Sequence, residues 1–248
     1  MKIALMVLIL LLAACSTSGG KDEEANKRKM AETNTSLGQG YMQRGQYEIS
    51  LEKLKRAIAN DATYAPAHTV LAVLYETIGE MELAEEEYLA ALKYDPRDGD
   101  INNNYGAFLC RSGKGTDAEP YFINAVEDPF YLTPEVAYSN AGNCFLEQGV
   151  LDKAESFLRQ SLEYNDKLPL TLISMADVYY QIGKYLRARA FLQRYGSVGA
   201  WDKDSLLLGY RIESKLGDFE SANRYRDELL EKFPDSRQAG QANDQEQV

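Results

Sequence analysis

A glycine recurs along the chain at a nearly constant interval, and this periodicity restricts the fold more than any other feature. Successive members of the series are 34, 34, 36, 34 and 34 residues apart. They are Gly45, Gly79, Gly113, Gly149, Gly183 and Gly217. Self-similarity at a fixed period of this length is typical of repeat proteins, in which each unit buries its apolar face against its neighbours.

Three other positions keep the same register. Five residues after each glycine the side chain is small, at Ser50, Ala84, Ala118, Ala154, Ala188 and Ala222. Seven before it the residue is usually small, at Gly38, Ala72, Gly106, Gly142, Ala176 and Tyr210. Four before it the residue is usually large and apolar, at Tyr41, Tyr75, Leu109, Phe145, Tyr179 and Glu213. This pattern predicts a helix hairpin per repeat: the small residues let two backbones cross closely, and the glycine takes a positive φ that ends the first helix.

The second repeat carries the clearest motif, with Leu71-Ala72, Tyr75, Gly79, Ala84, Tyr88, Ala91 and Pro96. It resembles the tetratricopeptide repeat. The resemblance implies an all-α protein, a right-handed α-α superhelix of six such repeats. They would span residues 31–64, 65–98, 99–134, 135–168, 169–202 and 203–236, with the two extra residues in the connection at 127–134. The sixth repeat departs from the pattern at Tyr210 and Glu213, which a capping repeat with a water-exposed outer face would tolerate.

The amino end predicts export and lipid attachment. Residues 1–14 contain Lys2 followed by an apolar run, which is shorter than the roughly 20 residues that span a bilayer and fits a signal peptide. Leu12-Ala13-Ala14-Cys15 has the form of a bacterial lipobox, in which the Cys15 thiolate takes a diacylglycerol as a thioether. The alternative is an ordinary signal peptide that happens to contain a cysteine. Ser16 replaces the aspartate of inner-membrane retention, so resemblance to sorted lipoproteins implies the periplasmic face of the outer membrane.

The two ends of the mature chain are polar. Residues 15–30 contain little to bury, so they are expected to form a flexible, lipidated tether between lipid and domain. Residues 237–248 are expected to form a polar tail that frays.

The composition argues against several classes of function. Lys and Arg number 27 against 38 Asp and Glu, which gives a net charge of −11 and disfavours nucleic acid as a partner. The single histidine, His68, is interpreted as a packing residue and not as a catalytic one. The chain has no glycine-rich phosphate loop and no His/Cys ligand spacing. We therefore expect no enzyme activity, metal, cofactor or small-molecule substrate.

Two cysteines remain in the repeats. Cys110 and Cys144 lie 34 residues apart, in the first helices of the third and fourth repeats. They are either two small buried residues or a disulfide that staples the repeats, and an exported chain favours the disulfide.

In a repeat array of this kind the first helices line a concave groove that binds partners. Counting from the glycines places these residues there: Met42, Thr69, Val73, Asn103, Ala107, Arg111, Asn143, Leu146, Ile173, Asp177 and Tyr180. Asn104 and Asn140 occupy equivalent positions in repeats three and four. Their amides could bond to a ligand backbone or bridge neighbouring helices, and bridging is slightly favoured.

Three segments suggest a more specific family. They are residues 37–47 (LGQGYMQRGQY), residues 103–110 (NNYGAFLC) and residues 140–142 (NAG). Together with the lipobox they resemble the PilF/PilW family of type IV pilus biogenesis lipoproteins, or pilotins. The resemblance implies that the partner is the pilus secretin subunit, which the lipoprotein would hold at the outer membrane and help to multimerise, for pilus biogenesis and twitching motility. Two alternatives stay open: a scaffold lipoprotein of another envelope machine (β-barrel assembly or cell-wall synthesis), and a periplasmic enzyme or enzyme activator.

Overall fold

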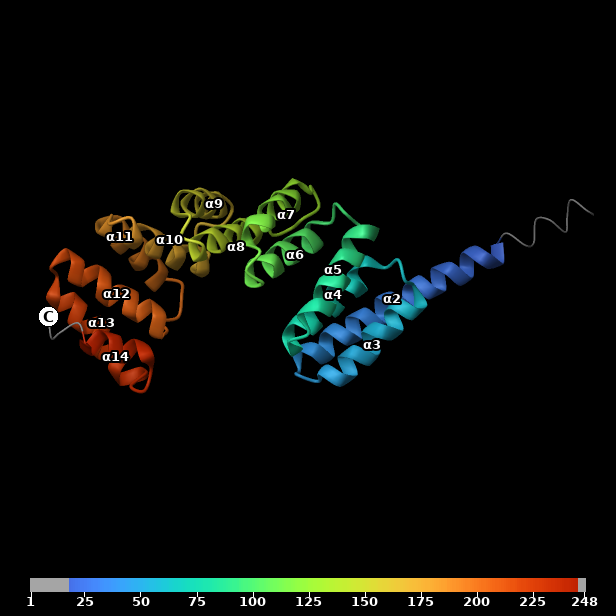
Figure 1. Ribbon diagram of the computed structural model, residues 1–248, viewed down its shortest axis with the longest axis horizontal. Coiled ribbons are helices and arrows are strands. Elements are labelled where there is room, and N and C mark those ends of the chain that lie inside the picture. The colour runs from blue at the N-terminus through green and yellow to red at the C-terminus, as the bar shows by residue number, and fades with distance from the viewer. Residues whose placement is uncertain (1–17, 245–248) are drawn as a thin grey trace, which may run out of the picture. The chain divides into compact units, whose positions relative to one another are not determined.

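The computed structural model describes residues 18–244, and every regular element within that range is an α-helix (Figure 1). The helices in the first half are α2 (Ser18–Gln43), α3 (Tyr47–Asn60), α4 (Ala65–Ile78), α5 (Met81–Tyr94), α6 (Gly99–Arg111) and α7 (Gly115–Glu127). Those in the second half are α8 (Pro134–Glu147), α9 (Leu151–Tyr164), α10 (Pro169–Gln181), α11 (Tyr185–Gly196), α12 (Lys203–Leu216), α13 (Phe219–Lys232) and α14 (Arg237–Asp244).

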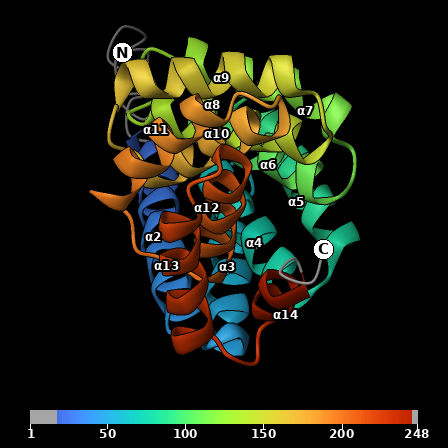
Figure 2. The same ribbon diagram turned by 90° about the vertical axis from the view of Figure 1, so that its left-hand side faces the viewer.

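The chain divides into two compact units, an N-terminal unit that ends at Tyr105 and a C-terminal unit that begins at Gly106. In the N-terminal unit α2 packs on α3, and α4 packs on α5, α3 and α2. In the C-terminal unit the hairpins are α8–α9, α10–α11 and α12–α13, and α10 contacts both α8 and α12. The first helices of repeats four to six therefore lie next to one another. Figure 2 shows the end of this unit, where α14 contacts α12 and α13.

The repeated glycines form the hairpin turns. In the described residues, the positive-φ positions are these six glycines, with Gly79 at φ 85°. The N–H of Gly79 donates to the Glu76 carbonyl at 3.1 Å, and that of Glu80 donates to the Tyr75 carbonyl at 2.9 Å, which closes the end of α4. A Cβ added at Gly79 would meet nothing within 4 Å, so the backbone conformation and not lack of space requires glycine. The predicted turns are confirmed.

The small residues in the first helices let the hairpins close. A Cβ on Gly142 would lie 2.5 Å from Leu158 Cγ, and one on Gly106 would lie 3.0 Å from Phe122 Cε1. On the second helices Ala84 and Ala154 are completely buried. Large side chains fill the space beside these crossings, as Tyr179 and Phe108 do, so the core consists of a series of similar hairpin interfaces. The all-α tetratricopeptide fold is confirmed.

The expectation of a flexible tether up to residue 30 is wrong from Ser18 onward. Helix α2 begins there, and it joins the core at Ala31, which is completely buried. Arg28 ties this part of the helix to the first hairpin, because its Nε lies 2.6 Å from Asp61 Oδ2 and its guanidinium covers the Tyr64 ring at 4.9 Å. The polar composition was misleading because Lys, Glu and Ala are strong helix formers even where nothing is buried.

The expectation that residues 237–248 fray is wrong for residues 237–244. They form α14, on which Ala239 and Ala242 are buried against α12 and α13. The sixth repeat consequently has no water-exposed outer face at Tyr210, which belongs to the same buried cluster. Glu213 is also buried and pairs with Arg189 of α11. Two alanines on one face of this short polar helix are enough to bury it against α12 and α13. Composition alone does not show that the two alanines share a face.

Residues 1–17 and 245–248 lie outside the described part of the chain. The predicted signal peptide and lipidated Cys15 fall within the first of these ranges. Among the described helices, none is both long enough and apolar enough to cross a membrane.

Candidate protein-binding site

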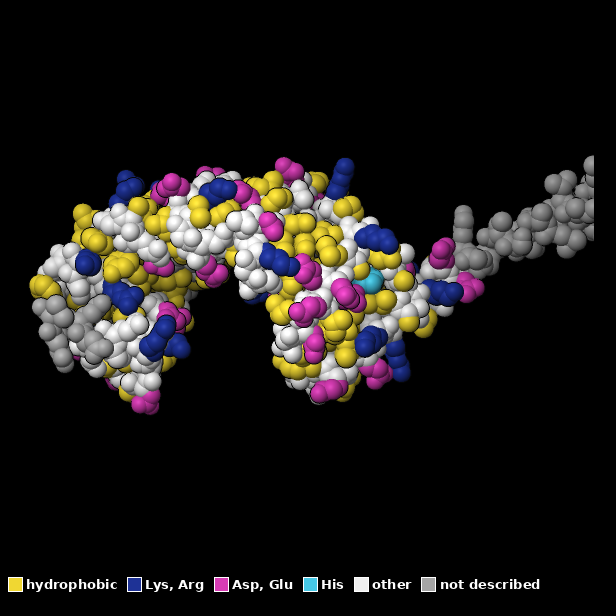
Figure 3. Space-filling view, viewed as in Figure 1, with side chains coloured by type: hydrophobic (Ala, Val, Ile, Leu, Met, Phe, Trp, Pro, Cys, Tyr) yellow, Lys and Arg dark blue, Asp and Glu magenta, His cyan; other side chains and the backbone are white. Residues whose placement is uncertain are grey.

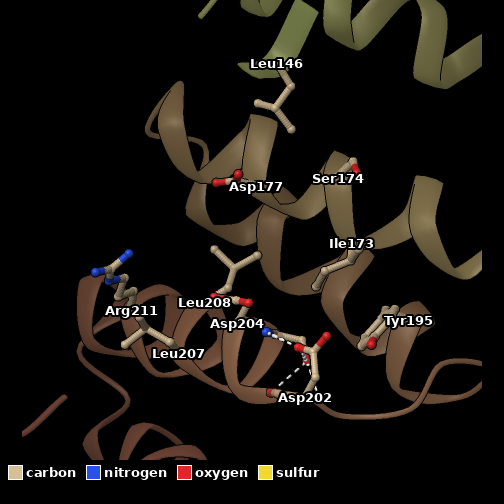
Figure 4. A pocket seen from close by; sticks show the side chains of 11 residues that line it. Leu146, Ile173, Ser174, Asp177, Tyr195, Asp202, Asp204, Leu207, Leu208 and Arg211 are labelled. Atoms are coloured by element: carbon tan, nitrogen blue, oxygen red, sulfur yellow. Dashed lines mark hydrogen bonds between the residues drawn. The ribbon is translucent and has the colours of Figure 1, made fainter. Parts of the chain in front are cut away.

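A hollow in the C-terminal unit lies on the face formed by α8, α10 and α12, and it has a volume of about 290 Å3. It is lined by Leu146, Ile173, Ser174, Asp177, Tyr195, Asp202, Asp204, Ser205, Leu207, Leu208 and Arg211 (Figure 4). A second depression, of about 710 Å3, adjoins it and shares Leu146 and Asp177. It is also lined by Asn143, Glu147, Gly149, Leu170 and Gln181. Figure 3 shows this unit, on the left, hollowed on the side where these first helices lie.

The floor of the hollow is apolar. Leu146 comes from the last turn of α8, Ile173 from α10, and Leu207 and Leu208 from α12. Figure 4 shows Leu146 pointing from α8 toward the space between α10 and α12. Leu207 and Leu208 are 4% and 9% exposed, so most of their surface already packs inside the unit and the hollow meets their remaining edge. Such a surface can accept apolar side chains from a partner.

Hydrogen bonds between and within the helices hold the walls of the hollow in place. The Ser174 hydroxyl donates to the Asn143 side-chain oxygen and so bridges α10 to α8. Asp202 caps α12: its Oδ1 accepts the Ser205 N–H at 2.8 Å, and the Asp202 N–H donates to the Ser205 hydroxyl at 2.9 Å. This capping box fixes the start of the helix that carries Asp204 and Leu208.

The polar groups around the hollow are mainly acidic. Burial raises the pKa of the Asp177 carboxyl, and a hydrogen bond from Gln181 and the charge of Arg211 partly oppose that rise. The side-chain oxygen of Asp204 accepts a hydrogen bond from Gln238 of α14 at 2.6 Å. The Arg211 guanidinium donates to Gln241, also of α14, at 3.1 Å. Helix α14 therefore holds the side chains of Asp204 and Arg211 in place through these two hydrogen bonds.

Comparison with known proteins identifies the family. Residues 35–101 and 71–131 match the model of the tetratricopeptide repeat. The type IV pilus assembly protein PilF of Pseudomonas aeruginosa is 31% identical over 237 residues, which cover 94% of this chain and 94% of that protein. The chain belongs to the PilF/PilW family. The solved structure of PilW, a widely conserved type IV pilus biogenesis factor, has a TM-score of 0.80 and 31% identity, and the match covers 85% of this chain and 97% of that one. The solved structure of Pseudomonas aeruginosa PilF has a TM-score of 0.81 and 30% identity, covering 89% and 99%.

Four residues predicted for the groove of this PilF/PilW-family chain meet at the hollow and its adjoining depression. They are Asn143, Leu146, Ile173 and Asp177. The Asn143 side-chain oxygen accepts a hydrogen bond from Ser174 and so links α8 to α10. The choice between bridging and ligand binding at Asn104 and Asn140 stays open.

The other predicted groove residues do not line this hollow. Met42, Thr69, Val73, Asn103 and Asn104 belong to the N-terminal unit. Thr69 is 7% exposed and donates to the Ala65 carbonyl of its own helix, and Asn103 is 8% exposed. Both residues therefore present little surface, and contact of either with a partner stays a prediction. Ala107, Arg111, Asn140 and Tyr180 belong to the C-terminal unit but lie outside the hollow.

Sequence reasoning missed the contribution of the sixth repeat. Ile173 and Asp177 lie ten and six residues before Gly183, and the same offsets from Gly217 give Leu207 and Arg211. Both line the hollow. The glycine register therefore points to both residues, although Tyr210 and Glu213 make the sixth repeat look irregular. Tyr195 and Asp202, in the last turn of α11 and the following connection, carry no such signal.

The cysteines and the histidine that the sequence singled out take part in holding the fold together. Cys110 and Cys144 form a disulfide, with Cα atoms 5.7 Å apart. His68 is 7% exposed, packs against the Tyr94 ring and bonds to Glu87, in keeping with a packing residue. Among the described residues, no group of three or more His, Cys, Asp or Glu side chains is placed to hold a metal ion. What the hollow offers chemically is non-covalent recognition: an apolar floor with carboxylates beside it.

Proposed function

We propose that this protein is an outer-membrane lipoprotein, a pilotin, that binds the secretin subunit of the type IV pilus and promotes its multimerisation. The observation that carries the proposal is the match along 94% of the chain to a type IV pilus assembly protein. Tetratricopeptide proteins act by binding other proteins, and the C-terminal unit of this chain offers a hollow with an apolar floor that can accept side chains of a partner.

The lipid anchor and the repeat array would have separate functions. Acyl chains on Cys15 would hold the protein at the periplasmic face of the outer membrane, because each buried methylene contributes about 0.8 kcal/mol and two or three chains together anchor stably. The repeat array would hold the secretin subunit there. Binding at a membrane surface raises the local subunit concentration, and ring assembly depends steeply on that concentration. The activity is thus binding and placement, without a covalent step.

A deletion strain tests the partner. We expect loss of outer-membrane secretin multimers and of twitching motility, both restored by the wild-type gene. Normal multimers together with a defect in β-barrel assembly or in the cell wall would contradict the proposal and favour a scaffold of another envelope machine. Normal secretin and a lost enzymatic activity would favour an enzyme activator.

Two substitutions test the predicted localisation at the outer membrane. Cys15→Ala removes the acyl acceptor, so we expect the chain and the secretin to leave the outer-membrane fraction; Thr17→Ala, which leaves the lipobox intact, is the matched control. Ser16→Asp introduces the residue of inner-membrane retention, and we expect it to move the lipoprotein to the inner membrane. If secretin multimers form normally in the Cys15→Ala strain, anchoring is not part of the mechanism.

A further inference from the structure

The hollow between α8, α10 and α12 combines an apolar floor with an excess of negative charge. Four carboxylates line the hollow and its adjoining depression: Glu147, Asp177, Asp202 and Asp204. Arg211 is the one basic side chain among the lining residues. Figure 4 shows Asp177 on α10 and Asp204 on α12 on the two sides of the hollow, with Leu208 between them.

We propose that this hollow binds a segment of the protein partner in which a bulky apolar side chain adjoins a lysine or arginine. The proposal rests on the proposed function for the existence of that partner, and it adds where the partner binds and which side chains it presents. The apolar side chain would pack on Leu146, Ile173 and Leu208, and the cation would lie against Asp177 and Asp204.

The size of the hollow supports a side-chain-sized occupant. Its volume of about 290 Å3 is at the lower end of the roughly 300–1,000 Å3 typical of ligand sites. That space accepts one or two side chains of a segment lying across the first helices. A lysine or arginine suits the boundary between floor and carboxylates, because its methylene stem covers apolar surface while its charged end stays at the polar edge.

The charges around the hollow favour a positively charged partner segment. Burial disfavours the charged form of Asp177, and Arg211 offsets this only in part. A second cation beside this carboxylate would stabilise its ionised form, whereas an acidic or phosphorylated segment would meet four like charges. A purely apolar segment would desolvate these carboxylates and supply no opposite charge, which costs binding free energy. A basic and apolar segment is therefore the occupant that matches both features.

The test compares two synthetic peptides that differ only in a central Leu-Arg or Leu-Gln pair. Each is titrated into the full mature chain at low ionic strength, with fluorescence anisotropy as the readout. We expect the Leu-Arg peptide to bind the wild type about tenfold more tightly, near the lower end of the range for close charge pairs at an interface. The double variant Asp177→Asn, Asp204→Asn should lose that preference. The variant Glu220→Gln, Asp227→Asn changes the charge equally at exposed positions of α13 and should keep it.

Leu146→Ala tests the floor and should weaken both peptides alike, since it removes apolar contact area without changing charge. Circular dichroism melts establish that each variant is folded. Equal affinity of the two peptides for the wild type, or loss of preference in the Glu220/Asp227 variant as well, overturns the inference. Calorimetric titration with the purified periplasmic region of the secretin decides the proposed function separately: no binding to the wild type contradicts secretin as partner, whatever the peptides show.

Discussion

His68 lies between two hydrogen-bond acceptors: its Nδ1 is 2.6 Å from Glu87 Oε2, and its Nε2 is 3.0 Å from the Ala62 carbonyl oxygen. A neutral imidazole has one N–H and can satisfy only one of them, whereas imidazolium satisfies both. Burial alone lowers the pKa of His68, but the hydrogen bonds to Glu87 and Ala62 and the charge of Glu87 outweigh burial, so the pKa is raised. When it is protonated, His68 thus ties the connection that precedes α4 to α5.

Stability should fall as the pH rises through the titration of His68. Because its folded pKa lies above the unfolded value, the stabilisation is fully present below about pH 6.5 and disappears as pH exceeds the folded pKa. Urea unfolding from about pH 5.5 to 8.5 should show a loss of roughly 1 kcal/mol for the wild type. His68→Gln should flatten the profile, and Glu87→Gln should reduce its slope. Parallel profiles for wild type and His68→Gln would contradict this assignment.

Gly79→Ala should destabilise the protein by about 1 kcal/mol, because an L-residue is strained at a φ of 85° even though its Cβ has free space. Gly40→Ala is the matched control. Gly40 lies within α2, and its Cβ would meet only the Arg44 guanidinium, at 3.8 Å. That substitution should be neutral or stabilising by up to roughly 1 kcal/mol, since alanine favours helix. The same sign for both in urea unfolding would count against the conformational explanation.

Gly142→Ala should destabilise by about 1–3 kcal/mol through overpacking, because the new Cβ would fall 2.5 Å from Leu158 Cγ. Leu158→Ala alone should also destabilise, by roughly 2–5 kcal/mol, because Leu158 is completely buried. In the double variant the added methyl group enters the space that the leucine vacates. The double-mutant cycle should therefore give a favourable coupling of at least about 0.5 kcal/mol, whereas simple additivity would show that the two residues do not compete for this space.

Glu213→Gln should destabilise by about 1–3 kcal/mol, because it leaves Arg189 without its nearly buried carboxylate partner. The Glu213 side chain is 5% exposed. Asp218 also pairs with Arg189, at 3.2 Å, but its side chain is 40% exposed. Asp218→Ala removes this solvent-screened pair together with the bond to the Ser221 N–H at the start of α13, so part of any loss belongs to the cap. A loss confined to Asp218→Ala would mean that the buried pair contributes nothing.

Reduction of the Cys110–Cys144 disulfide should lower the free energy of unfolding by about 2–4 kcal/mol, since the bond closes a long loop in the unfolded chain. The measurement is urea unfolding with and without dithiothreitol. A Cys110→Ala, Cys144→Ala double variant should already be destabilised and should not respond to the reductant. A response in that variant would show that the reductant acts elsewhere.

Features set by local sequence were predictable. The hairpins follow from residues within a single repeat, because a glycine turn such as Gly79 and a small residue such as Ala84 act on neighbouring helices of that repeat. The period also located Asn143 and Ile173 on the face that forms the hollow. A repeat contacts mainly its neighbours, so a short-range pattern determines most of the fold.

The repeated glycines were therefore readable from the sequence alone, as was the family resemblance, whereas the lipobox lies outside the described residues and its lipidation stays a prediction. Only the tertiary structure showed that α14 covers the last repeat, that Glu213 is buried on Arg189, and that Asp177 and Asp204 lie at one hollow. Each of these depends on residues far apart in sequence, or on a surface that two alanines are enough to bury. The free energy of such contacts comes from packing and desolvation between helices, which no pattern within one helix encodes.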